Sequence, residues 1–126
     1  MNLTAIKKVV HLGRDTEARE ACQRARELEN VGDFEGAREE LSGFWALIGE
    51  RPQLEGLEGH TQAELLLRVG SLSGSLGSAR QISNAQEFAK DLITEANRRF
   101  ESLGDYEKLA EAQTDLDLLL ARRLNG

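Results

Sequence analysis

Apolar residues along the chain recur at intervals of three and four, which is the spacing of one face of an α-helix. No stretch shows the sustained alternation that is typical of a strand. The clearest stripe runs through Ala85, Phe88, Ala89, Leu92, Ile93, Ala96, Phe100 and Leu103. It predicts a helix that begins near Ser83, where Ser83 and Gln86 have the spacing of a capping box, and that ends at Gly104.

The same pattern predicts six helices joined by short connections. Their expected ranges are 3–12, 15–32, 33–49, 61–76, 83–104 and 106–124. Capping residues mark the starts at Asp33, Asp105 and Thr61, the last of which has Glu64 as its capping-box partner. Residues 51–59 hold the only proline and read as a loop. We therefore expect one all-α domain over residues 1–126, built as antiparallel helix hairpins.

The starts of alternate helices suggest an internal repeat. They fall near Asp15, Thr61 and Asp105, which are 46 and 44 residues apart. A recurring helix pair of this length is typical of a solenoid, in which neighbouring hairpins bury one another's apolar faces. The separation is nearer the roughly 40–47 residues of HEAT-type units than the roughly 34 of a tetratricopeptide unit, so the period alone leaves the family open.

Three glycines within one expected helix indicate close packing. Gly70, Gly74 and Gly77 lie on one side of that helix because they are four and three residues apart. A glycine inside a helix costs roughly 1 kcal/mol relative to alanine. Their presence favours an approach of a neighbouring helix backbone to backbone. A phosphate-binding loop is disfavoured, since no strand precedes the segment and no Gly-Lys follows it.

These small residues give the chain a resemblance to the tetratricopeptide repeat family. Val69-Gly70, followed by Gly77 and Ala85, is similar to the family's pattern across a helix pair. The segment Gly32-Asp33-Phe34-Glu35-Gly36-Ala37 resembles its turn between paired helices, and residues 92–116 resemble longer bacterial variants of the repeat. The resemblance covers about residues 15–124 with degenerate motifs. It departs from the family at Asp117, where a small residue is usual, and the last repeat is half a repeat.

The resemblance implies a non-enzymatic scaffold that binds a protein or peptide on the concave face of an α-hairpin solenoid. The outward positions of the first helix of each pair would be Arg19, Arg26, Asn30, Glu64, Leu67, Ser71, Ser75, Glu111, Thr114, Leu118 and Arg122. Mixed charge at these positions predicts a polar groove of modest affinity.

An alternative function is self-association through the last helix. Leucines surround most of its circumference, and Leu116, Leu119 and Leu120 are the candidate contacts of a homodimer. One face of this helix can pack on the preceding helix, whereas the sequence offers nothing to cover the other. We expect either that the helix continues into further repeats of a longer protein or that it buries this face in a dimer. Trp45 is expected to fill the gap to the next helix pair, and the alternative is a half-exposed anchor at an interface.

Charge and composition narrow the partners. Sixteen Lys and Arg against 22 Asp and Glu give a net charge of −6, which argues against nucleic-acid binding as the main role. No apolar stretch approaches the roughly 20 residues of a membrane span, and Lys7 and Lys8 interrupt any signal-peptide core. We expect a cytoplasmic protein by default.

Few residues favour catalysis, and we expect no catalytic, cofactor or metal site. His11 and His60 are the only histidines, too few to anchor a metal site with the residues near them in sequence. Cys22 is the only cysteine, which excludes an internal disulfide. It lies on the apolar face of its helix and is expected to pack as a small hydrophobic side chain.

Overall fold

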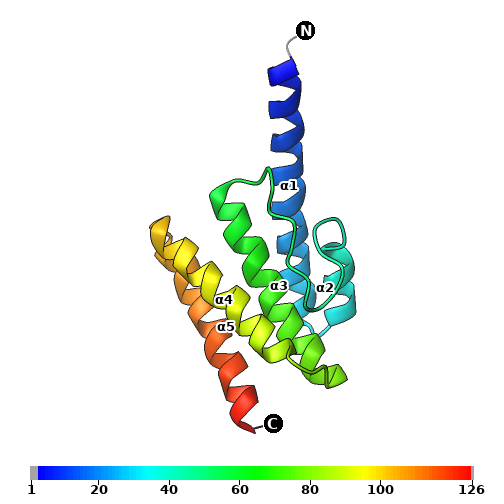
Figure 1. Ribbon diagram of the computed structural model, residues 1–126, viewed down its shortest axis with the longest axis vertical. Coiled ribbons are helices and arrows are strands. Elements are labelled where there is room, and N and C mark those ends of the chain that lie inside the picture. The colour runs from blue at the N-terminus through cyan, green and yellow to red at the C-terminus, as the bar shows by residue number, and fades with distance from the viewer. Residues whose placement is uncertain (1–2, 126) are drawn as a thin grey trace.

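The structure is a computed structural model that describes the backbone of residues 3–125 and the side chains of residues 13–121. Within this part of the chain all regular structure is helical, as the apolar spacing predicts. The helices are α1 (Leu3–Asn30), α2 (Phe34–Glu40), α3 (Gly59–Arg80), α4 (Ala85–Ser102) and α5 (Tyr106–Asn125). Successive helices reverse direction, so that sequence neighbours are antiparallel (Figure 1).

The central helix is α3, which contacts each of the other four helices. In Figure 1, α1 and α2 lie on one side of α3, and α4 and α5 lie on the other. All residues of the segment 65–77 except Ser71 are buried. A helix that is surrounded by other helices has no solvent-exposed face. This position explains why the segment is an almost continuous run of leucines, small residues and valine.

The three glycines of α3 lie where other helices come closest, as the sequence predicts. A Cβ atom on Gly70 would stand 2.8 Å from Ile93 Cγ1 and 3.2 Å from the carbonyl oxygen of Ala89. A Cβ on Gly74 would meet Leu119 Cδ1 at 2.8 Å, and one on Gly77 would collide with Ala85. Both α4 and α5 therefore pack on the glycine side of α3.

The expectation of six helices is wrong, because the described residues form five. The predicted break at Gly13 is absent. Gly13 lies inside α1, whose full length is 28 residues. A single glycine costs a helix only about 1 kcal/mol, which is too little to end it when the flanking residues favour helix. The first turns of α1 project beyond the rest of the molecule (Figure 1).

The predicted helix over residues 33–49 is also wrong, since α2 ends at Glu40. Phe44 and Trp45 are 5% and 3% exposed, and adjacent positions of a helix point about 100° apart. The chain leaves the helix after Leu41, and both rings enter the core. This packing agrees with the expected role of Trp45.

The caps after glycine are confirmed. Gly32 and Gly104 adopt the positive φ angles, 83° and 72°, that favour glycine. The next residue caps a helix in each case. Asp33 Oδ1 accepts from the backbone N–H of Gly36 at 2.9 Å, and Asp105 Oδ1 accepts from that of Lys108 at 3.1 Å.

Neither predicted capping box forms. The cap of α4 is Asn84, in the left-handed conformation, and the Gln86 side chain instead donates to the carbonyl oxygen of Gly74 at 3.1 Å. Thr61 lies inside α3, which already begins at Gly59, and it is 1% exposed. A capping-box pattern describes hydrogen bonds that two side chains can form locally, and tertiary packing prevents them at both positions here.

None of the helices in the described part of the chain has the length and apolar character that crossing a bilayer requires.

We predict that Gly70→Ala destabilises the protein by about 1–3 kcal/mol, because the added methyl group must displace the buried Ile93 side chain or the α4 backbone. The matched control is Gly13→Ala in α1, where nothing lies within 4 Å of the added atom. That change should stabilise by up to about 1 kcal/mol through helix propensity alone. Urea unfolding followed by circular dichroism measures both changes. Equal effects of the two substitutions would contradict the close approach.

Candidate functional site

Helices α1, α3 and α5 together form one face of the molecule, and two adjoining hollows open on it. The larger, which we call the central groove, has a volume of about 420 Å³. Its lining comes from all three helices and the start of α2: Arg26, Glu29, Asn30, Phe34, Arg68, Ser71, Ser75, Glu111, Thr114, Asp115 and Leu118.

The central groove brings together seven of the eleven residues predicted to bind a partner. They are Arg26, Asn30, Ser71, Ser75, Glu111, Thr114 and Leu118. Two more, Arg19 and Glu64, line the second hollow, which we call the end pocket and which has a volume of about 270 Å³. Its other lining residues include His60, Thr61, Asp105 and Lys108. Nine of the eleven positions that the resemblance assigned to partner binding thus line one of the two hollows.

Two predicted positions do not join them. Leu67 is fully buried, so its assignment to the concave surface is wrong. The reason is that α3 is enclosed on nearly all sides, which leaves only Ser71 within the segment 65–77 partly open. The side chain of Arg122 lies outside the described residues.

Arg68 forms the charged floor of the central groove. Its side chain is 5% exposed and pairs with three carboxylates. The distances are 2.8 Å to Glu29, 3.1 Å to Asp115 and 3.4 Å to Glu111. Ser71 Oγ donates to Glu29 at 2.6 Å. One guanidinium therefore ties α1 and α5 to the central helix.

Two further cations extend this network along the face. Arg26 pairs with Glu111 at 2.7 Å, and Lys108 pairs with Glu111 at 3.1 Å and with Glu64 at 2.5 Å. Glu111 belongs to the central groove and Glu64 to the end pocket. Lys108 therefore links the two hollows through its ion pairs.

The network contains more negative than positive charge. Its carboxylates are Glu29, Glu64, Glu111 and Asp115, and its cations are Arg26, Arg68 and Lys108. The pKa of Asp115 is raised, chiefly by burial. The charge of Arg68 opposes this rise, and the nearby Glu111 adds to it. Burial would lower the pKa of Arg68, but the surrounding carboxylates outweigh it and raise that pKa.

Sequence reasoning missed four residues of the central groove: Glu29, Phe34, Arg68 and Asp115. A signal for Arg68 was available, because it interrupts the apolar run from Leu65 to Val69. An arginine inside a buried segment needs paired carboxylates. Which carboxylates serve it could not be read from sequence, since they lie 39 to 47 residues away on two other helices.

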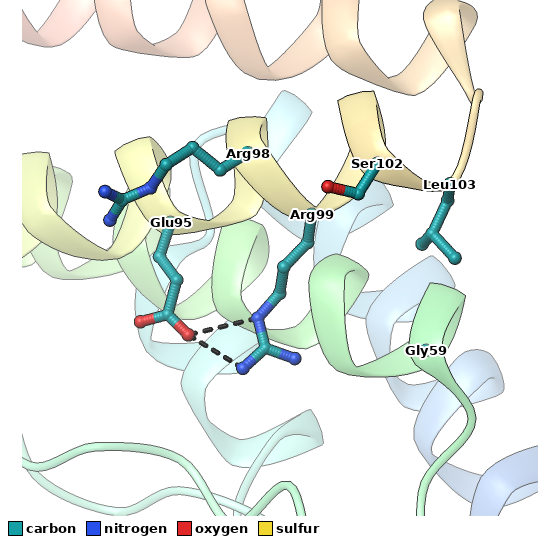
Figure 2. A pocket seen from close by; sticks show the side chains of 6 residues that line it. All are labelled: Gly59, Glu95, Arg98, Arg99, Ser102 and Leu103. Atoms are coloured by element: carbon teal, nitrogen blue, oxygen red, sulfur yellow. Dashed lines mark hydrogen bonds and ion pairs between the residues drawn. The ribbon is translucent and has the colours of Figure 1, made fainter.

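A third hollow, of about 400 Å³, lies between the start of α3 and the second half of α4. Figure 2 shows Arg99 turned toward Glu95, while the Arg98 side chain extends away from that pair. Arg51, from the segment between α2 and α3, binds the same carboxylate through both ends of its guanidinium at 2.8 and 2.7 Å. The pKa of Glu95 falls from 4.5 to about 2, chiefly because Arg51 donates hydrogen bonds to it. These contacts fasten the segment to the helices.

The structure buries the single cysteine of the chain. Cys22 is 2% exposed and packs as a small apolar side chain, as predicted, and burial raises its pKa to about 12. Residues 13–121 contain no group of three or more His, Cys, Asp and Glu side chains arranged to hold a metal ion. The face formed by α1, α3 and α5 carries a groove with fixed charges and two apolar side chains, Phe34 and Leu118.

Comparisons with protein-family models, curated proteins and solved structures find no match to this chain. The function is therefore argued from the geometry of the central groove.

We predict that Arg68→Met costs about 3 kcal/mol of stability at neutral pH, because it leaves Glu29, Glu111 and Asp115 buried together without their shared cation. The charge of Arg68 lowers the pKa of Asp115, so without it that pKa would rise further in the folded variant. The folded state would then take up a proton more readily than the unfolded state. The difference in stability between the variant and the unmodified protein should accordingly shrink as the pH falls from neutral to about 5. Urea unfolding of both proteins across that range measures it. A constant deficit would contradict this electrostatic origin.

We predict that Glu95→Gln destabilises the protein by about 1 kcal/mol at neutral pH, since it removes the charge that Arg51 and Arg99 share. The folded pKa of Glu95 is lowered, so its contribution is complete above 4.5 and is lost as the pH falls toward about 2. The two proteins should converge over that interval. Fluorescence of Trp45, the only tryptophan, reports unfolding. A difference that persists at the lowest pH would argue against the assignment.

Proposed function

We propose that this chain is a non-enzymatic module that binds a protein or peptide segment in the central groove. The observation that carries the proposal is that α1, α3 and α5 jointly line one groove of about 420 Å³. A volume of this size is in the range of ligand-binding clefts. Seven of the positions that the resemblance to the repeat family assigned to binding line this groove.

The proposed architecture is a tetratricopeptide-like solenoid of two helix pairs and a half. Three observations support it. Successive helices are antiparallel (Figure 1), α3 contacts both α1 and α5, and the glycines of α3 allow the close approach typical of stacked hairpins. Two features depart from a regular repeat: α2 has only 7 residues, and a segment with no regular helix separates it from α3.

The lining of the groove suits a peptide better than a small polar molecule. Arg26, Glu111 and Asp115 supply charge, whereas Phe34 and Leu118 supply apolar surface. Leu118 is 54% exposed, which makes it available for burial by a partner. Groove binding of a short segment uses this combination of an apolar anchor with a polar rim.

Self-association through α5 remains the second candidate, and one observation favours it. Leu120 is 37% exposed and does not belong to the central groove. The homodimer face expected from sequence needs a correction, because Leu119 is 2% exposed and packs against Gly74 inside the chain. Leu116 packs against the core and is only partly buried. A dimer would therefore centre on Leu120 with the open part of Leu116.

Two leucines on different faces of α5 separate the candidates experimentally. A random linear peptide library is selected on the immobilised full chain, and enriched peptides are measured by fluorescence anisotropy. Leu118→Gln should weaken their binding about tenfold or more, since it removes the apolar wall without adding a charge. Leu120→Gln is the matched control and should leave peptide affinity unchanged.

The contrary outcomes are equally specific. An absence of enriched peptides, or peptides that bind equally well to Leu118→Gln, would overturn the groove as a binding site. Sedimentation equilibrium of the unliganded chain tests the second candidate. A dimer that dissociates on Leu120→Glu would establish self-association, whereas a monomer at all concentrations would remove it.

A further inference from the structure

The charges that line the central groove define the kind of segment it would accept. Three of the lining carboxylates, Glu29, Glu111 and Asp115, face two lining cations, Arg26 and Arg68. Including Lys108 and Glu64 adds one charge of each sign, so the surplus of one negative charge persists. The chain as a whole carries a net charge of −6, which favours the approach of positively charged segments.

The cations of the groove are already engaged. The Arg68 side chain is 5% exposed beneath its three carboxylates, and Arg26 pairs with Glu111 at 2.7 Å. An anionic ligand would have to break these pairs. Asp115 is more accessible, because Oδ2 accepts from Arg68 while 20% of its side chain remains exposed. A cation can therefore bind beside Asp115 without displacing a resident partner.

The apolar side chains of the groove separate a peptide from a free cation. Phe34 and Leu118 form an apolar wall beside the charged residues. A bare metal ion has no apolar group to bury against this wall, whereas a peptide can place an apolar side chain there next to its basic one. Charge and wall together favour a polypeptide over a free cation.

We propose that the central groove selects a basic peptide segment, with a Lys or Arg side chain that pairs with Asp115 and an adjacent apolar side chain that packs on Phe34 and Leu118. This inference rests on the proposed function and names its partner class. The surplus carboxylate then acquires its counter-charge from the ligand.

The test uses the peptides enriched on the full chain. We expect them to contain Lys or Arg next to an apolar residue, and replacement of that basic residue by Met should weaken binding about tenfold. On Asp115→Asn the same replacement should matter no more than about twofold, because the partner charge is gone. Asp91→Asn is the matched control, since Asp91 is exposed on α4 and lies outside the groove. It should retain the full tenfold difference.

A second pair of variants, at Thr114, tests the charge selection if Asp115→Asn fails to fold. Thr114 is exposed in the groove and its hydroxyl bonds only within α5, so Thr114→Lys adds a cation there with little effect on packing. It should weaken the basic peptides about tenfold, whereas the uncharged Thr114→Met should not. Peptides that need Leu118 but carry no basic residue would overturn the charge selection and leave the proposed function standing. Peptides indifferent to Leu118→Gln would overturn the proposed function itself.

Discussion

The enclosure of α3 is the constraint on which the rest of the structure depends. A helix that contacts four others must bring at least one of them very close, and Gly70, Gly74 and Gly77 provide that approach to α4 and α5. The opposite side of α3 is left to α1 and α2. Because α3 fills the middle, α1 and α5 can only flank it, and the groove that they line with Ser71 follows from this arrangement.

Arg68 lies in this enclosed helix and is the centre of the charged site. A guanidinium in the most buried helix must find carboxylates, and it finds them on the two flanking helices, at Glu29, Glu111 and Asp115. These pairs therefore fix which turns of α1 and α5 face each other. The fold and the candidate site use the same side chains, so that a change in the register of either helix would alter both. Buried ion pairs often contribute little net stability, but they discriminate strongly between arrangements.

Sequence reasoning succeeded where a local rule and the tertiary contact agree. The Gly-Asp turns at Gly32 and Gly104 and the glycine side of α3 were predictable from spacing alone. Most of the positions that line the groove came instead from the resemblance to the repeat family. Sequence reasoning failed where packing overrode a local signal. Gly13 reads as a helix end but costs too little to stop α1, and Thr61 reads as a cap but lies inside α3. The burial of Leu67 depends on helices remote in sequence.

Asp115, the surplus carboxylate of the network, differs in its importance for the fold and for binding. Glu29 and Glu111 already give Arg68 two counter-charges, and Glu111 has Arg26 and Lys108 as further partners. Asp115 adds a third negative charge near Glu111, and like charges in a partly buried site oppose each other. For the folded chain alone, Asp115 is thus the least necessary member of the network. For a basic segment in the groove it is the most accessible one, which makes its position more readily explained by a ligand than by stability.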